Sequence, residues 1–143
     1  MEHLIPSRLR NTFNDLGLLI LRLWFGGAML FAHGMPKLQT FSEKANLFPD
    51  PLGLGSQLSL VLAIGAEVGC ALLLMLGLAT RLVSVPLVFT MAVAAFVVHG
   101  DDPFSKQEFA LMYGFAYLGL FFTGPGRFSL DQLISRKKGA RHS

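Results

Sequence analysis

Four long apolar stretches constrain what this chain can fold into. The stretches run from Leu16 to Ala32, Leu58 to Ala79, Leu82 to Val98 and Phe109 to Phe122. The only charged residues inside them are Arg22 and Glu67. Crossing the ~30 Å hydrocarbon core of a bilayer takes about 20 such residues in a helix. Charged residues make up only 15 % of the chain, against about 25 % in soluble domains. The sequence therefore predicts a membrane protein and excludes a soluble domain.

The predicted fold is an all-α, four-transmembrane-helix bundle that forms a single domain over residues 1–143. Backbone groups in lipid must be satisfied within each segment, so the apolar stretches are expected to be helices. Pro36 is expected to kink the first helix at its end, and Ser129 with Gln132 has the spacing of a capping box. The expected spans are residues 16–35, 58–79, 82–99 and 107–123, with a short interfacial helix at 39–48, a surface helix from Leu130 and a basic tail at 130–143.

Basic residues are concentrated on one side of the expected bundle. That side receives Arg8, Arg10, Arg81, Arg127, Arg136, Lys137, Lys138 and Arg141. The positive-inside rule then places both termini in the cytoplasm. The net charge of +3 is explained by basic flanks that meet anionic lipid. The partner indicated is the lipid bilayer, and nucleic-acid binding is excluded because no soluble module carries a basic face.

Two charged side chains are predicted to lie within the membrane. A charge near the centre of a spanning helix costs at least about 2.5–3.5 kcal/mol, so such a residue usually has a partner and a function. Counting from the ends of the apolar stretches puts Glu67 near the midplane and Arg22 about 7 Å from it in height. The sequence therefore predicts an ion pair between Arg22 and Glu67.

A second layer of ionisable residues is expected near the outer face. His33 ends the first span, His99 ends the third and Glu108 begins the fourth. Arg22 and His33 share a helical stripe that Lys37 would continue. These placements predict one polar site in the outer half of the bundle, open toward the outer face.

Each of these residues also has a structural interpretation. Glu108 has capping-box spacing with Ser105, and a histidine at a membrane boundary is often only an interfacial residue. Glu67 could be protonated and hydrogen-bonded without further function. The lone cysteine, Cys70, excludes an internal disulfide and is expected to serve as a small packing residue.

The chain resembles the DoxX family in residues spread over about 16–133. The closing segment Gly124-Pro125-Gly126-Arg127-Phe128-Ser129-Leu130-Asp131 is similar to the end typical of that family. The other matching positions are Leu21-Arg22, Gly26, Phe31-Ala32-His33-Gly34, Lys37 and Glu67.

The resemblance implies a small bacterial inner-membrane protein built as a four-helix bundle. Members are associated with quinone-linked redox work, including a subunit of thiosulfate:quinone oxidoreductase, and with thiol-stress enzymes. Related thiol-redox membrane proteins use paired cysteines, which this chain lacks. The activity class implied is an oxidoreductase or a subunit of one.

The first functional hypothesis is a quinone, or a similar small redox ligand, bound between the helices. Glu67, His33 and Arg22 are the candidate catalytic residues, because they could relay protons and set the local field. His99 and Lys37 join them as candidate ligand-binding residues. The chain contains no recognisable electron carrier, so electrons would come from a redox partner protein or a bound cofactor.

Two alternatives remain open at this stage. His33, His99 and Glu108 together form a ligand set suited to a divalent metal. The protein could instead be a non-enzymatic scaffold or assembly partner, with its buried charges holding the bundle together. A homo-oligomer is compatible with each hypothesis.

Overall fold

The computed structural model describes residues 7–140 as a set of packed helices, with no strand in this part of the chain. The first helix runs without interruption for 33 residues, from Ser7 to Gln39. It consists of α1 (Ser7–Ala28), a π-helix η2 (Met29–Gly34) and α2 (Met35–Gln39). Pro36 therefore does not end the helix, which continues through the junction of η2 and α2 as far as Gln39.

The second and third helices follow the same plan. The second is α4 (Ser56–Ile64), the π-helix η3 (Gly65–Cys70) and α5 (Ala71–Leu76), and the third is α6 (Thr80–Val93) followed by the π-helix η4 (Ala94–Val98). Between the first two lies α3 (Phe41–Lys44), a single turn that is shorter than the interfacial helix expected there. The hairpin between the second and third helices turns through Gly77 and Ala79, both with left-handed backbone conformations.

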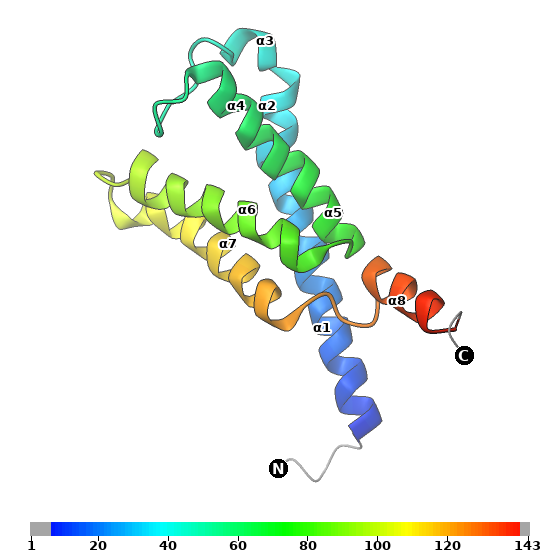
Figure 1. The fold of residues 1–143 in the computed structure, drawn as a ribbon. Helices are drawn as coiled ribbons and strands as arrows, with labels where there is room; N and C mark the ends of the chain where they lie inside the picture. Colours follow the sequence, from blue (N-terminus) through cyan, green and yellow to red (C-terminus); the bar gives the residue numbers. More distant parts are fainter. Residues whose placement is uncertain (1–6, 141–143) are drawn as a thin grey trace.

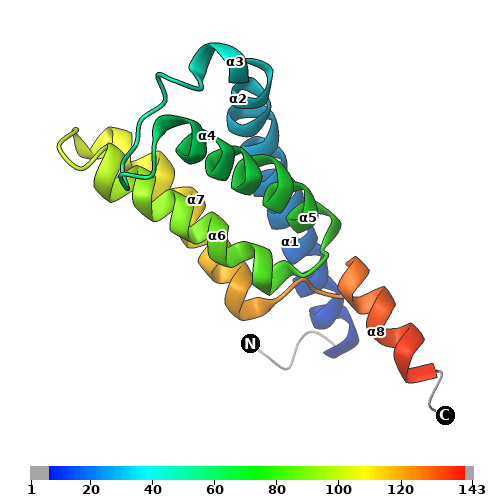
Figure 2. The same ribbon diagram turned by 45° about the horizontal axis from the view of Figure 1, so that its top comes forward.

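The last two helices are α7 (Phe104–Thr123) and α8 (Leu130–Ala140). Figures 1 and 2 show α7 lying along α6, while α8 projects sideways at the end where α1 begins. The two halves of the molecule diverge from there: α1–α2 with α4–α5 forms one arm, and α6 with α7 the other.

Three of the helices are long and apolar enough to cross a membrane, namely Ser7–Gln39, Ser56–Leu76 and Thr80–Val98. The fourth expected span corresponds to α7, which is 20 residues long but opens with the polar residues Ser105, Lys106, Gln107 and Glu108. The prediction of an all-helical membrane protein is confirmed to this extent.

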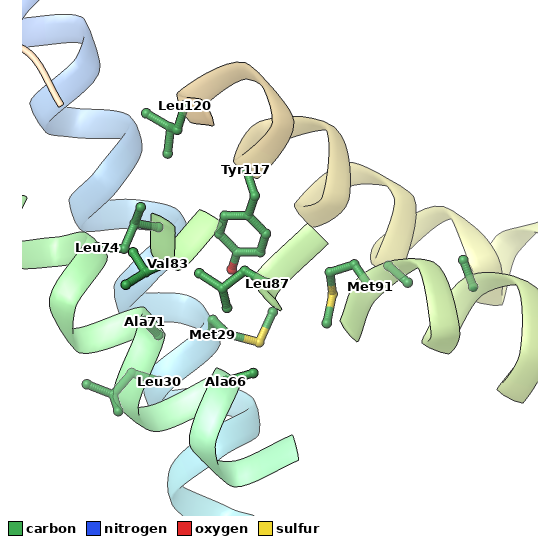
Figure 3. Close-up of a cluster of buried hydrophobic side chains, with 12 residues drawn as sticks. Met29, Leu30, Ala66, Ala71, Leu74, Val83, Leu87, Met91, Tyr117 and Leu120 are labelled. Atoms are coloured by element: carbon green, nitrogen blue, oxygen red, sulfur yellow. The ribbon is translucent and has the colours of Figure 1, made fainter. Parts of the chain in front are cut away.

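All four long helices contribute to one hydrophobic core. Tyr117 of α7 is fully buried and points into this cluster, as Figure 3 shows. Close packing of this kind fixes how the arms meet, and it therefore positions the polar residues on either side of it. The other core residues are Met29, Leu30, Ala66, Ala71, Leu74, Val83, Leu87, Met91, Ala95, Ala110 and Leu120.

Candidate functional site

A buried ion pair between Lys37 and Glu67 is the centre of the candidate site. The Lys37 Nζ lies 2.6 Å from Glu67 Oε2, and the two side chains are 21 % and 7 % exposed. The same ammonium also lies 3.4 Å from the backbone oxygen of His33, one turn earlier. A carboxylate this well buried is stable as an anion only with such a partner.

The expected partner of Glu67 was wrong. The prediction paired it with Arg22, whose side chain points into another part of the molecule. Arg22 and Lys37 are about 22 Å apart along one helix at 1.5 Å per residue, so one carboxylate cannot serve both. Lys37 takes this place because the first helix continues past Pro36, beyond the end of the apolar stretch, as far as Gln39.

Two π-helices bring the ion pair together. Glu67 lies within η3, and Lys37 lies in α2, which directly follows η2. Gly34, the last residue of η2, is buried against the backbone of Glu67: a Cβ at this position would lie 2.7 Å from the Glu67 carbonyl oxygen. Single π-turns in α-helices are frequent at functional sites. Gly34 therefore sets how closely Glu67 approaches the first helix.

Aromatic residues from two helices border the site. The ring of Tyr113 on α7 packs edge-to-face against His33, with centroids 5.6 Å apart, and against Phe25 at 5.5 Å. Tyr117 lies 6.1 Å from Tyr113 and donates a hydrogen bond of 3.0 Å to the backbone oxygen of Phe25. The His33 ring itself is exposed at the surface of the helix.

A small hollow adjoins the ion pair. It has a volume of about 420 Å³ and is lined by Lys37, Lys44, Leu47, Phe48 and Pro49. Lysine carries three N–H donors, and two of those on Lys37 face Glu67 and the His33 carbonyl. The third remains available to an acceptor. The hollow therefore shares Lys37 with the ion pair, while Glu67 does not line it.

Arg22 is not part of the site around Lys37 and Glu67. It has a structural role, as a clamp between two segments of the chain. It is 1 % exposed and donates from Nη1 to the Pro125 carbonyl and from Nη2 to the Phe128 carbonyl, the latter at 2.7 Å. Gly77 presses against the guanidinium, since a Cβ there would lie 2.6 Å from Nη1. The clamp ties α1 to the segment that follows α7.

The closing Gly124–Asp131 segment completes this clamp. Asp131 accepts hydrogen bonds from the backbone N–H groups of Ala79 at 2.7 Å and Thr80 at 3.1 Å, which caps α6. Ser129 Oγ accepts from the Gln132 N–H at 3.3 Å, so the predicted start of the last helix at Leu130 is confirmed, with Ser129 as its N-cap. The Gly124–Asp131 segment, which resembles the end typical of the DoxX family, thus has a structural role in this chain.

His99 and Glu108 do not join the ion pair. His99 Nδ1 lies 2.7 Å from Asp102 Oδ2, and this hydrogen bond keeps the pKa of the Asp102 carboxyl below its usual range. Gln107 Nε2 donates to the His99 carbonyl at 2.9 Å, which closes the loop after η4. Glu108 is exposed on α7.

Two predictions about these residues fail. The helix α7 begins at Phe104 with Pro103 as its N-cap, so Ser105 and Glu108 do not form a capping box. Among residues 7–140 no three His, Cys, Asp or Glu side chains gather as a metal site, so His33, His99 and Glu108 are not assembled as a ligand set. The physical reason is the divergence of the arms that carry His33 and His99.

Sequence reasoning missed Tyr113 and the positioning role of Gly34. Tyr113 lies in an uninterrupted apolar stretch, where an aromatic residue is expected to serve only in packing. The one available signal was its spacing of four from Tyr117, which places both on one face of a helix. Lys37 was predicted as a binding residue, but without its partner.

Helical membrane proteins with a lysine–glutamate ion pair between two long helices form the class that this fold and site define. Residues 17–100 match the DoxX family. This match covers more than half of the chain, so the chain belongs to the DoxX family.

Two relatives align over most of their length. One is a protein from Bacillus subtilis named "Putative oxidoreductase CatD", 30 % identical over 125 residues, covering 87 % of this chain and 91 % of the relative. The other is a Haemophilus influenzae protein described as "Uncharacterized protein", 29 % identical over 131 residues and covering 86 % of each chain. No solved structure matches the chain.

Proposed function

We propose that this DoxX protein binds a quinone or a similar small redox ligand beside the Lys37–Glu67 ion pair and works in membrane redox or thiol-stress metabolism. The observation that carries the proposal is the ion pair that Lys37 of the first helix forms with the buried Glu67 of the second, which is the only charged residue of Ser56–Leu76. Ionisable residues within membrane-spanning helices pair with one another and mark ligand or proton pathways. The name of the Bacillus subtilis relative supports the same chemical class.

The residues present fit such a ligand. A quinone offers two carbonyl oxygens as acceptors and, when bound, supplies two-electron, two-proton chemistry. Lys37 retains one N–H to donate, and the exposed His33 ring can donate to or accept from a second oxygen. Glu67 lies within hydrogen-bond reach of Lys37 and can hold or release a proton there. Electrons would come from a partner protein.

We further propose that α7 completes a four-span bundle in the inner membrane, with both termini cytoplasmic. Large exposed side chains on α7 support this, since Phe109, Phe115 and Phe122 are 66 %, 69 % and 69 % exposed. Such aromatics suit a lipid-facing surface. Arg81 and Arg127 lie at the α8 end of the molecule, near the beginning of α1, in agreement with a cytoplasmic side.

Titration of the purified full-length chain with ubiquinone-1 tests the proposed ligand. Saturable binding near one ligand per chain is expected, and Glu67→Gln and His33→Ala should each weaken it about tenfold or more, as for lost hydrogen bonds to charged or polar groups. His99→Gln is the matched control, because the His99 ring bonds Asp102 in the loop after η4 and not the Lys37–Glu67 pair. Absence of saturable binding by a folded wild-type chain contradicts the proposal and favours the scaffold alternative.

A further inference from the structure

The hollow beside the ion pair carries more positive than negative charge. Two of its lining residues are lysines, Lys37 and Lys44, and none is acidic. Lys37 is neutralised by Glu67, which does not line the hollow. Lys44 is exposed at the end of α3, and no carboxylate of the described residues pairs with it. The two lysines and the one glutamate therefore leave one positive charge uncompensated.

The path of the chain brings Lys44 to the same side as Lys37. The Thr40 N–H donates to the Pro36 carbonyl at 3.1 Å and the Lys44 N–H to the Thr40 carbonyl at 3.0 Å, so helical turns continue from α2 into α3. Residues seven apart in consecutive helical turns share a face. This spacing explains why both lysines line one hollow.

Apolar residues close the hollow directly after Lys44. The N–H groups of Leu47 and Phe48 both donate to the Lys44 carbonyl, at 3.0 Å and 2.9 Å, which holds these two residues beside it. The wall of the hollow is mostly apolar. Lysine stems can contribute to such a wall while their ammonium groups stay in water. A ligand that suits the hollow has an apolar body for the wall and a negative oxygen for the ammonium groups.

We infer that Lys44 is a second binding residue of the site at Lys37, and that the redox ligand carries one acidic group on an apolar body. The inference rests on the proposed function and deepens it by naming the charge of the ligand. The acidic oxygen is bound by the Lys44 ammonium and by the N–H of Lys37 that Glu67 and the His33 carbonyl leave available. A neutral quinone leaves the charge of Lys44 uncompensated, so an acidic quinone is preferred.

Two ligands that share a ring system but differ in charge test the inference. Phthiocol is a hydroxynaphthoquinone that is an anion at neutral pH, and its methyl ether is neutral. Titration of the full-length chain in phosphatidylcholine nanodiscs should show phthiocol binding about fivefold more tightly, as for an exposed ion pair. Equal affinity for the two overturns the inference and leaves the proposed function standing. A folded chain that binds neither of them, nor ubiquinone-1, overturns the proposed function as well.

A lysine variant assigns the preference to its residue. Lys44→Gln should bind both ligands with equal affinity, while its affinity for the ether and its unfolding midpoint stay at the wild-type values. Lys106→Gln is the matched control, because Lys106 is also an exposed lysine but lies near Asp102 at the start of α7. The control should keep the preference for phthiocol. Retention of the preference in Lys44→Gln, or its loss in Lys106→Gln, overturns the inference.

An anionic lipid headgroup has the same chemistry as an acidic redox ligand, because it also joins a negative oxygen to an apolar body. The same titrations in nanodiscs that contain phosphatidylglycerol separate the two sources. The preference of the wild-type chain for phthiocol is expected to persist in these discs. Its abolition by phosphatidylglycerol would assign the hollow to a lipid headgroup and overturn the inference.

Discussion

Lys37 and Glu67 depend on each other, because each is the only ion-pair partner that the described residues offer the other. Lys37→Met leaves a buried carboxylate without its cation, and we expect a loss of about 3–5 kcal/mol in the free energy of unfolding. The double variant Lys37→Met with Glu67→Gln removes both charges and should recover most of that loss. Denaturant titration in detergent micelles measures both, and a double variant as unstable as the single one would contradict the pairing.

Arg22 has a different task, and its variants should separate stability from ligand binding. Arg22→Met removes the donors to the Pro125 and Phe128 carbonyls, each a charged hydrogen bond worth about 1.5–3 kcal/mol. We expect faster hydrogen exchange in the segment from Gly124 to Asp131 and easier proteolysis before α8. Ubiquinone-1 affinity of the folded fraction should stay near that of wild type. A selective loss of affinity without loosening of that segment would restore Arg22 to the site.

Asp50 stabilises the loop before α4 through several hydrogen bonds to one carboxylate. Its carboxylate accepts hydrogen bonds from the N–H groups of Leu54 and Gly55, each at 2.8 Å, and from Ser59 Oγ at 3.0 Å. The bond from Gly55 is the largest cause that lowers the pKa of this carboxyl. A depressed pKa in the folded state means that the stabilisation is present at neutral pH and is lost as the pH falls through that pKa.

The Leu54 and Gly55 amide resonances should therefore shift together at a midpoint below that of an unstructured aspartate. NMR titration of these two amides measures the midpoint. Asp50→Asn should abolish the transition, and its persistence in that variant would show that another group titrates there.

Between elements, the approach of η2 to η3 decides the geometry of the site. Gly34→Ala places a Cβ 2.7 Å from the Glu67 carbonyl oxygen, which is backbone and cannot rotate away. Overpacking of this kind costs about 1–3 kcal/mol, and the separation of the two helices should weaken ubiquinone-1 binding as well. Thermal unfolding and ligand titration report the two effects.

The second helix supplies a control for this substitution. Gly65 lies in open space, with no atom within 4 Å of an added Cβ. Gly65→Ala should therefore be tolerated in both measurements. Equal damage from both alanines would show that loss of helical flexibility, and not the close approach at Gly34, is the cause.

At the scale of the whole molecule, the distribution of charge predicts the topology. In a Cys70→Ser background, Asp101→Cys should react with a membrane-impermeant maleimide in intact cells, and Arg136→Cys only after the cells are opened. The first lies in the loop after η4 and the second on α8, at opposite ends of α7. Labelling of both from the same side would exclude α7 as a span.

Much of this architecture follows from the sequence, because apolar stretches and turn residues act locally. The second, third and fourth long helices and the start of α8 were predicted close to their observed bounds, whereas the first helix, Ser7–Gln39, is much longer than the span expected at 16–35. The pairing of charges was not predicted, since it depends on how far the first helix runs past Pro36. Nor was the separation of His33 from His99, which results from the divergence of two arms packed through a distant core. The one signal that Tyr113 carried was its spacing of four from Tyr117.

The three π-helices have a consequence for how this protein balances durability against activity. Each widens a helix that would be more regular without it, and two of the three adjoin the Lys37–Glu67 pair. Natural proteins often tolerate such local irregularity where activity needs it, so that the most heat-resistant version of a chain is not the most active one. A variant of this chain selected only for resistance to heat should straighten η2 or η3 first, and it should lose its ligand in doing so.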